Sequence, residues 1–257
     1  MSPQTLLTSP SLSLTPEPLT RDGFAPFGTA IIPPLPRTTT SAPNPLSSHP
    51  THRLVPAPVA ANQLSALKYS PISPLTNNYP SQCPSKQPSE ARMTMFSCFP
   101  RALRTAAANP KPRVENKKVF DVGILERHPF TTQTFTPLGL SYDDKGETYY
   151  LVIVAPTLKG EVATATTGSG EKVSIRDPPD LSRLRAFVAS GGEAVTYGAG
   201  TWHAPMVVVG QRRVDFVVVQ FANGVGDEDC QEVCFKEGVV VDLSGVRAGS
   251  EEVKSKL

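Results

Sequence analysis

Two of the four histidines stand where they could take part in chemistry. His49 and His52 lie in a run of Pro, Ser and Thr, where a solvated loop histidine is the simpler interpretation. His128 and His203 lie in segments with a strand-like pattern and distinctive neighbours. These two imidazoles are the starting point for a candidate site.

The segment around His128 brings three kinds of polar side chain together. Glu126 and His128 are two positions apart, and side chains two apart in an extended strand share one face. Pro129 restricts His128 to an extended backbone, and Gln133 follows across a turn. We therefore expect a carboxylate, an imidazole and an amide to face one space.

His203 follows a glycine-rich turn. Gly192, Gly198 and Gly200 bracket a short strand and a tight turn, so His203 begins the return strand with its imidazole near the mouth of the turn. A buried, hydrogen-bonded hairpin histidine would explain His203 taken alone. If it converges with the three polar side chains of the other segment, they form a nitrogen and oxygen site for a divalent metal or a small polar substrate.

A region with a β pattern carries these residues. After Val114, short strand-like segments alternate with Gly, Pro and Asp turn signals, and no long amphipathic helix separates them. Such spacing is typical of a sandwich or a barrel. One helical turn, with Asp180 as its N-cap, interrupts the strands. The expected strands cover residues 119–124, 132–136, 149–155, 185–189, 194–197, 206–209, 214–221 and 239–242, with weaker ones at 29–32, 62–70 and 93–99.

Proline divides the chain into two differently built parts. Of the 27 prolines, 21 precede Val114, whereas 16 of the 18 glycines follow it. A Pro-rich first part cannot be mostly regular helix or central sheet. We predict a disordered leader over residues 1–13, a single domain over 14–243 and a polar tail over 244–257. Within the domain, residues 33–60 read as a Pro/Ser-rich loop insertion.

Charge and cysteine content exclude several classes of protein. Lys+Arg 25 against Asp+Glu 23 leaves a net charge of +2, so no charge excess points to nucleic acid or an anionic membrane surface. No run approaches the roughly 18 apolar residues of a membrane-spanning helix. Cys83, Cys98, Cys230 and Cys234 contain no C-x-x-C pair, which is typical of a reduced compartment. We expect a cytoplasmic protein without nucleic-acid or membrane partners.

The turn before His203 resembles the second motif of the cupin superfamily, G-x5-P-x-G-x2-H-x3-N. Its spacing matches Gly192, Gly198, Gly200 and His203. Gly198 stands in place of the motif's proline, and Val207 stands in place of its asparagine.

The segment around His128 resembles the first cupin motif, H-x-H-x3/4-E, more loosely. Glu126 stands in place of the first histidine, His128 is the second, and Gln133 stands in place of the glutamate. Two of the four usual ligands have therefore changed type, and a metal site is suggested without being established.

Four longer runs resemble a more specific family, the ureidoglycolate lyases (ureidoglycolate hydrolase type) of the fungal kind. They are LERHPFTTQTF, DLSRLRAF, VTYGAGTWHAPM and DFVVVQF, at residues 125–135, 180–187, 195–206 and 215–221. With further runs at 19–32, 62–69 and 96–103, the resemblance covers most of residues 14–235. It implies a mainly β fold, a cupin-type (RmlC-like) antiparallel β-barrel or jelly roll with an N-terminal arm and few short helices. It also implies a homodimer.

The activity that the resemblance implies is cleavage of (S)-ureidoglycolate to glyoxylate and urea in allantoin and purine breakdown. One substrate carbon carries a hydroxyl, a carboxylate and a urea nitrogen. Collapse of the hydroxyl to a carbonyl expels urea, which needs a base for the O–H and a proton for the departing nitrogen. The carboxylate must also be held.

With this chemistry, we assign catalytic roles to Glu126, His128 and His203. The same three side chains and Gln133 would hold a divalent metal such as Ni, Zn or Mn, acting as a Lewis acid, and no organic cofactor is expected. The substrate would contact Gln133, Lys68, Asn62, Tyr197 and Trp202, and Lys68 could also protonate urea. Arg185 and Gln220 are weaker candidates for holding the carboxylate or the ureido group.

Three other interpretations stay open at this point. A different cupin enzyme, such as a metal-dependent oxygenase or isomerase, is disfavoured because the first motif lacks its pair of histidines. A non-catalytic or differently specific small-molecule-binding cupin would tolerate the changed ligands. A third alternative is a degenerate enzyme whose Pro-rich insertion disturbs the N-terminal part.

Overall fold

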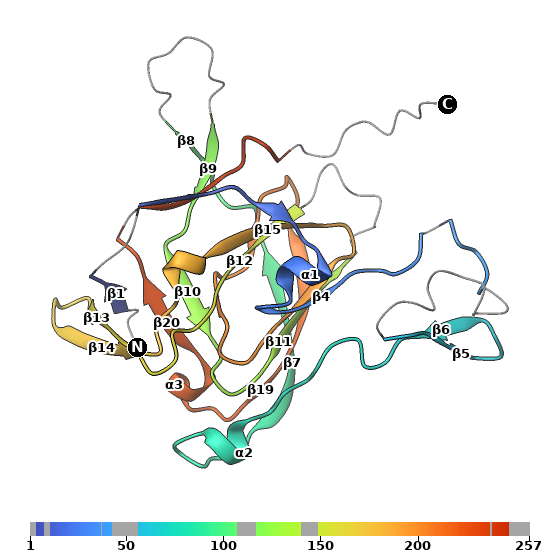
Figure 1. Cartoon of the computed structure of the whole chain (residues 1–257), viewed down its shortest axis with the longest axis horizontal. Helices are drawn as coiled ribbons and strands as arrows, with labels where there is room; N and C mark the ends of the chain where they lie inside the picture. Colours follow the sequence, from blue (N-terminus) through green and yellow to red (C-terminus); the bar gives the residue numbers. More distant parts are fainter. Residues whose placement is uncertain are drawn as a thin grey trace, which may run out of the picture.

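The computed structural model describes residues 4–7, 11–36, 38–42, 56–106, 117–139, 149–236 and 238–246, and its regular structure is mainly β (Figure 1). The few helices are single turns. They are α1 (Arg21–Phe24), α2 (Tyr79–Gln82), α3 (Gly226–Asp229) and the 3-10 turn η3 (Leu181–Arg183). None of the helices in the described ranges is both long and apolar enough to cross a membrane.

The strands that carry Glu126 and His203 belong to one sheet, here called the long sheet. Its members are β1 (Gln4–Leu6), β3 (Glu17–Pro18), β10 (Ile124–Arg127), β12 (Tyr149–Ala155), β13 (Val162–Thr166), β14 (Lys172–Arg176), β15 (Arg185–Ser190), β17 (Trp202–His203), β18 (Val207–Val208) and β20 (Gln231–Cys234). Their order across the sheet is β14-β13-β1-β20-β10-β17-β12-β15-β3, and β18 also pairs with β12.

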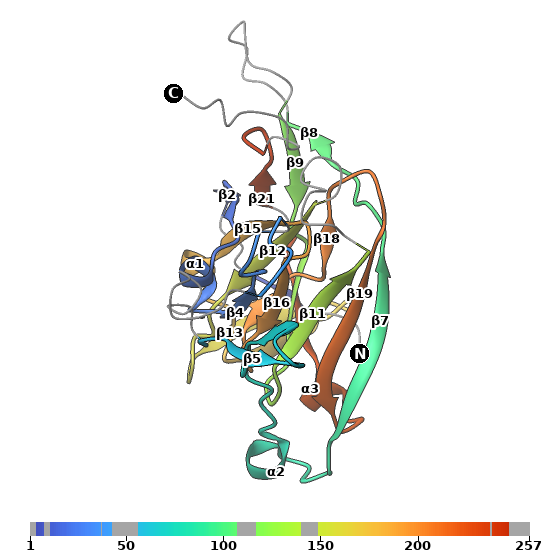
Figure 2. The same ribbon diagram turned by 90° about the vertical axis from the view of Figure 1, so that its right-hand side faces the viewer.

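A second sheet of five strands lies against the long sheet. It consists of β4 (Gly28–Ile31), β7 (Glu90–Cys98), β11 (Gln133–Leu138), β16 (Ala194–Tyr197) and β19 (Val214–Ala222), in the order β4-β16-β11-β19-β7. Figure 2 shows β7 as the outer edge of this sheet, beside β19.

Two smaller sheets complete the described strands. One contains β2 (Leu12–Leu14), β8 (Arg104–Thr105), β9 (Lys118–Asp121) and β21 (Val239–Asp242), in the order β2-β21-β9-β8. The other is the hairpin of β5 (Val59–Ala61) and β6 (Ala66–Lys68), which stands apart from the body of the molecule in Figure 1.

Side chains from both faces of β12 build two apolar clusters. Tyr150, Val152 and Val154 point between the long sheet and the five-stranded sheet, where they meet Phe135 and Phe216. We call this face of both sheets the inner face. Because alternate residues of a strand project to opposite sides, the remaining residues of β12 enter a second cluster.

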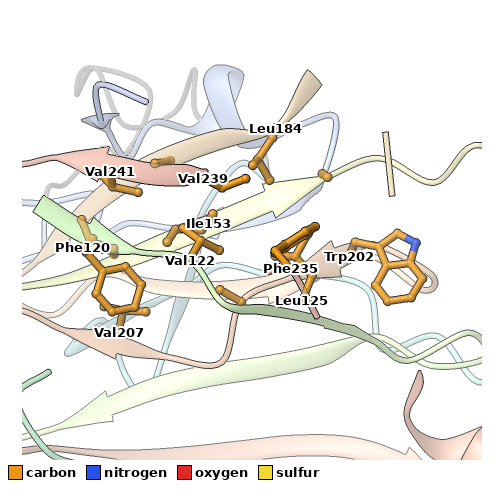
Figure 3. Close-up of a cluster of buried hydrophobic side chains, with 14 of the residues drawn as sticks. Phe120, Val122, Leu125, Ile153, Leu184, Trp202, Val207, Phe235, Val239 and Val241 are labelled. Carbon is orange, nitrogen blue, oxygen red and sulfur yellow. The ribbon is translucent and has the colours of Figure 1, made fainter. Parts of the chain in front are cut away.

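The second cluster lies on the outer face of the long sheet. It contains Leu151 and Ile153 of β12, with Leu125, Trp202 and Phe235 from neighbouring segments (Figure 3). Burial on both faces explains why β12 is an unbroken apolar run rather than an alternating one. This doubly buried strand is the centre of the fold.

The predicted mainly β fold with few short helices is confirmed, but a closed barrel is not. Within the described strands the two large sheets lie face to face, and β7 ends one of them without a further strand. The long sheet and the four-stranded sheet are also mixed, because β1 and β3 pair parallel with β20 and β15, and β2 pairs parallel with β21. These three strands come from the N-terminal segment, which adds to strands made much later in the chain.

The leader over residues 1–13 was predicted to be disordered, and this was wrong where the structure describes it. β1 pairs with β13 and β20, β2 pairs with β21, and Leu6 is buried. Main-chain hydrogen bonds along a strand require no periodic sequence. A short Ser/Thr/Leu segment can therefore join a sheet although its sequence has no strand pattern.

The Pro/Ser-rich insertion and the tail are described only in part. Residues 37 and 43–55, with His49 and His52, and residues 247–257 lie outside the described ranges. Within the insertion, β5 begins at Val59.

Several strand predictions match residue for residue. The structure has β12, β16 and β21 with the expected bounds, and Asp180 caps η3 by accepting a hydrogen bond from the Ser182 backbone N–H at 3.1 Å. The hairpin of β13 and β14 was missed, although its side chains alternate between more and less exposed positions.

Candidate active site

Strand register brings Glu126 and His203 together. β10 pairs with β17 so that Glu126 lies opposite His203, and β12 pairs with β17 so that Val154 lies opposite His203. Opposed residues share a face, and Val154 belongs to the inner cluster. The carboxylate and the imidazole therefore both project to the inner face.

The turn before β17 fixes His128 beside this pair. Gly200 has a left-handed φ of 80°, which a glycine adopts without strain, and its backbone N–H donates to the carbonyl oxygen of His128 at 2.8 Å. The glycine turn and the segment after β10 are thus bonded directly to each other. The two predicted motifs converge as expected.

The three side chains form a compact, mostly buried cluster. His203 Nε2 lies 3.4 Å from Glu126 Oε1, and the two imidazole rings are 5.5 Å apart. One ligand atom from each of Glu126, His128 and His203 lies within 4.8 Å of the others. The exposed fraction is 1% for His203 and 7% for His128, against 19% for the Glu126 side chain, so the carboxylate is the most accessible member.

Backbone carbonyls hold Nδ1 of both imidazoles and direct Nε2 toward the cluster. The carbonyl oxygens of Asp229 and Thr201 accept from Nδ1 of His128 at 2.6 Å and of His203 at 3.0 Å. Each Nδ1 therefore carries its proton, which leaves Nε2 as the free nitrogen. Both Nε2 atoms are buried and lack a hydrogen-bond partner within the described residues. Buried polar atoms are rarely left in this state, so both nitrogens are poised for a proton, an ion or a substrate.

Electrostatics keep the carboxylate ionised and one imidazole neutral. Burial raises the pKa of Glu126, but the imidazoles of His203 and His128 outweigh it, and the net pKa lies below its usual range. Burial first, and then the neighbouring His203, lowers the pKa of His128. An ionised Glu126 facing a lone pair on His203 Nε2 would be repelled, so this 3.4 Å contact requires a proton or a cation between them.

The five-stranded sheet contributes a wall and an amide to the same space. The Tyr197 ring stacks on the His203 ring at 3.9 Å with an interplanar angle of 10°. Gln133 lies opposite Tyr197 in the pairing of β11 with β16. Its Nε2 donates to Gln220 Oε1 at 2.6 Å, and its buried Oε1 lacks a partner among the described residues.

Comparison of the sequence with known proteins identifies the family. The sequence model described as "Ureidoglycolate lyase" matches residues 11–242 of the chain. The chain belongs to the ureidoglycolate lyase family.

Curated members of the ureidoglycolate lyase family are similar over most of their length. A relative from Saccharomyces cerevisiae is 31% identical over 235 residues, covering 89% of this chain and 97% of the relative. One from Schizosaccharomyces pombe is 35% identical over 173 residues, covering 67% of this chain and 75% of the relative. One from Pseudomonas syringae pv. syringae is 27% identical over 227 residues, covering 88% of this chain and 92% of the relative. All three carry the name ureidoglycolate lyase.

Other residues predicted for a lyase site lie elsewhere. Trp202 precedes His203 in β17 and so lies on the outer face, inside the apolar cluster of Figure 3. Lys68 lies on β6, and Asn62 lies in the turn of the β5–β6 hairpin, which forms a sheet of its own. Arg185 is bonded to both carboxylate oxygens of Glu17, at 3.0 and 2.6 Å.

Cys230 and Glu232 are neighbours of the site that the sequence did not indicate. Cys230 Sγ lies 3.9 Å from Glu126 Oε2, and Glu232 lies opposite Glu126 in the pairing of β10 with β20. Burial, followed by the nearby carboxylates, raises the pKa of Cys230 to about 12, so its thiol stays protonated. No motif links these positions to the histidines, and their proximity comes from strand pairing alone.

A buried polar network supports the carbonyl that orients His128. The Tyr79 hydroxyl donates to Asp229 Oδ1 at 2.7 Å, and Asp229 in turn holds the backbone N–H groups of Asn223 and Gly224 at 2.8 Å. Tyr79 belongs to the Pro-rich half of the chain. The N-terminal part therefore stabilises the site without contributing a group to the cluster.

A cavity of about 1150 Å³ lies next to the cluster but does not contain it. Its lining includes Arg127, Trp202 and Gln231, which alternate along their strands with the inner-face residues. None of the three clustered side chains lines this cavity.

Proposed function

We propose that this chain cleaves (S)-ureidoglycolate to glyoxylate and urea, as a ureidoglycolate lyase of allantoin and purine catabolism. The observation that carries the proposal is the convergence of Glu126, His128 and His203, whose two buried Nε2 atoms have no hydrogen-bond partner among the described residues. Family membership over residues 11–242 supports the same activity.

The two imidazoles suit the two proton transfers of the reaction, one as the base and the other as the acid. His128 Nε2, in a ring kept neutral by burial, accepts the proton of the substrate hydroxyl. The electron pair of that O–H bond forms the carbonyl of glyoxylate, and the C–N bond breaks toward the ureido nitrogen. That nitrogen takes up the proton held between His203 Nε2 and Glu126 Oε1. Different surroundings of two nearby titratable groups thus separate base from acid.

The five-stranded sheet orients the ureido group. Gln133 Oε1 is a buried acceptor without a partner in the described residues, and it would accept an N–H of the ureido group. Tyr197, stacked on His203, would limit the space on the opposite side. Contacts of Lys68, Asn62 and Trp202 with substrate stay predictions.

The cluster also fits a divalent ion. Two buried imidazole nitrogens, which lack hydrogen-bond partners in the described part of the chain, and one carboxylate have ligand atoms within 4.8 Å of one another. They form the donor set that Zn, Ni or Mn accepts, and Gln133 Oε1 is the predicted fourth donor. When bound, such an ion would act as a Lewis acid toward the substrate hydroxyl and carboxylate. Glu126, His128 and His203 would hold it.

Glyoxylate release from ureidoglycolate by the purified protein tests the proposal, with and without prior metal removal. Release that survives metal removal assigns the chemistry to the side chains alone, whereas loss that is restored by adding the ion assigns the cluster to a metal. Absence of glyoxylate in both preparations would contradict the activity. It would favour a small-molecule-binding cupin without this chemistry.

The proposal also covers the fold type and the oligomeric state. We treat the face-to-face sheets as an opened cupin-type barrel in a single domain of a cytoplasmic protein. The free edge of β7 carries Met93 and Met95, which are 75% and 62% exposed. An exposed edge strand can pair antiparallel with its own copy about a two-fold axis, which favours a homodimer through β7. A Met95→Lys variant measured by light scattering should be monomeric if this edge is the contact.

A further inference from the structure

Two glutamines on neighbouring strands form a hydrogen-bonded amide pair on the five-stranded sheet. Gln133 of β11 lies opposite Gln220 of β19, and Gln133 Nε2 donates to Gln220 Oε1 at 2.6 Å. Phe135 and Val218, which lie two residues away on the same strands, belong to the inner cluster. Both amides therefore project to the inner face, into the space that holds the histidines.

One hydrogen bond decides which end of the Gln133 amide is left for a ligand. An amide group has a nitrogen end that donates and an oxygen end that accepts. Because the nitrogen end of Gln133 is bonded to Gln220, the oxygen Oε1 is the end left for another partner. This oxygen is buried and has no hydrogen-bond partner among the described residues. Buried acceptors are rarely left in this state, and an N–H or O–H of a ligand would satisfy it.

The main chain around the pair is fixed on both strands. The Thr131 hydroxyl accepts from the Phe221 N–H at 3.0 Å and donates to the Thr132 carbonyl at 2.8 Å, and Thr131 is only 1% exposed. These bonds lie directly beside the pairing of Gln133 with Gln220. The acceptor on Gln220 is therefore held in register with Gln133, which makes Gln220 a positioning residue.

The oxygen of Gln133 lies beside the reacting centre. Gln133 also lies opposite Tyr197, and the side chains of such a pair start about 5 Å apart. The Tyr197 ring in turn stacks on the His203 ring at 3.9 Å. Gln133 and His203 are thus neighbours of the same tyrosine, and a ligand held at the histidines is within reach of the glutamine.

The groups that face this space match a ligand rich in hydrogen-bond donors. Gln133 Oε1 and His128 Nε2 have no partner in the described part of the chain, and Glu126 adds a carboxylate. Ureidoglycolate offers a hydroxyl, an internal N–H and a terminal NH2. Its carboxylate is bonded to the reacting carbon and stays at the histidine cluster, whereas its terminal NH2 is three bonds away and extends toward Gln133.

We infer that Gln133, positioned by Gln220, selects substrates that end in an unsubstituted ureido group by accepting a hydrogen bond from the terminal NH2. The inference rests on the proposed function and makes it more specific, because it defines the ligand class as N-carbamoyl compounds. An N-acyl compound of the same shape would leave the Gln133 oxygen buried and unpaired. Gln220 touches no substrate atom in this arrangement and acts through Gln133.

The test compares two unreactive ligands of the same shape. Ureidoacetate lacks the hydroxyl that collapses to a carbonyl, and N-acetylglycine differs from ureidoacetate only by a methyl group in place of the terminal NH2. In isothermal titration calorimetry, the wild-type protein should bind ureidoacetate about 10- to 100-fold more tightly than N-acetylglycine. This preference should fall below about threefold in Gln133→Leu, which lacks the acceptor, and in Gln220→Leu, in which the Gln133 amide is free to turn.

Gln220→Glu is the conservative variant, because a carboxylate still accepts from Gln133 Nε2. Its added charge repels both anionic ligands equally, so the preference for ureidoacetate should stay near tenfold or above. Gln87→Leu is the matched control, since Gln87 is an exposed glutamine outside the sheets, and it should keep the wild-type preference. Thermal unfolding verifies that each variant is folded.

Equal binding of the two ligands by the wild-type protein would overturn the subsite. A preference that is lost in Gln133→Leu but survives in Gln220→Leu would show that Gln220 does not position the amide, and so would its loss in Gln220→Glu. Glyoxylate release from ureidoglycolate is measured in parallel. Release without a preference leaves the function standing and removes the subsite, whereas a preference without release removes the function and keeps a binding site for ureido compounds.

Discussion

The two faces of β10 and β17 differ in how their polar groups are satisfied. On the outer face, Arg127 donates to Gln231 Oε1 at 2.8 Å and to the carbonyl oxygens of Asp177 and Arg176 at 2.9 and 3.0 Å. Its guanidinium also lies 4.8 Å from the ring centroid of Trp202, whose Nε1–H donates to the Asp177 carbonyl at 3.1 Å. Every one of these contacts is internal to the protein.

On the inner face, three buried polar side chains are only partly hydrogen-bonded. His203 and His128 each leave Nε2 without a partner in the described part of the chain, and so does Oε1 of Gln133. A buried polar atom without a partner costs free energy unless a ligand supplies one. The outer face, whose polar groups are hydrogen-bonded within the protein, stabilises the fold. The inner face, whose polar groups lack partners in the described part of the chain, is available to bind and convert a ligand.

Glu126→Gln should have the largest effect on the inner face. Loss of the ionised carboxylate removes the group that holds the proton at His203, and we expect kcat/KM to fall about 1000-fold, near 4 kcal/mol of transition-state stabilisation. The melting temperature should be unchanged or higher. Steady-state glyoxylate release and thermal unfolding measure the two quantities.

Glu171→Gln is the control for that variant, because Glu171 is an exposed glutamate in the turn between β13 and β14 and its loss changes the net charge equally. Its activity should stay within about threefold of wild type, well short of a general acid–base loss. Full activity in Glu126→Gln would contradict the assigned role and favour a binding module.

Arg127→Met should show the reverse pattern on the outer face. Methionine keeps the apolar stem but leaves Gln231 Oε1 and the Arg176 carbonyl without the donor that Arg127 supplies, while the Asp177 carbonyl keeps only Trp202, so we expect the free energy of unfolding to fall by about 3 kcal/mol. Activity of the folded fraction should stay within about threefold. Chemical denaturation gives the stability, and Arg104→Gln, which breaks an exposed ion pair with Asp121, should leave the stability nearly unchanged.

Trp202→Phe should have a smaller effect of the same kind. The change removes the Nε1–H that donates to the Asp177 carbonyl and weakens the contact with Arg127, which together contribute about 1–2 kcal/mol. Because the ring lies on the outer face, KM for ureidoglycolate should not change. A tenfold rise in KM with an unchanged melting temperature would place Trp202 in the substrate site after all.

Lys68→Met should have the smallest effect. Lys68 lies on an exposed hairpin that pairs only with itself among the described strands, so within one chain we expect less than about a threefold change in kcat/KM. The measurement is again glyoxylate release. A loss near 100-fold would show that the hairpin reaches a site, in its own chain or in a second copy.

Much of the site could be predicted from local rules. The two-residue spacing of Glu126 and His128, the proline after them and the glycine turn before His203 all indicate their local geometry correctly. The same period-two rule places Trp202 and His203 on opposite faces of the sheet, as the structure has them, and contact of Trp202 with substrate stays a prediction. Cys230 gave no signal, because its position beside Glu126 depends on the pairing of β10 with β20, which lie far apart in the sequence.

The sequence by itself determined the strands of the central region, the conformations of the turns and which side chains share a strand face, because these depend on neighbouring residues. Only the tertiary structure decided which strands lie side by side. Register then placed Glu126 opposite His203 and Gln133 opposite Gln220, and it attached the N-terminal segment to the sheets. Pairing between distant segments depends on hydrogen bonds and packing summed over whole sheets, and no short pattern in the chain specifies it.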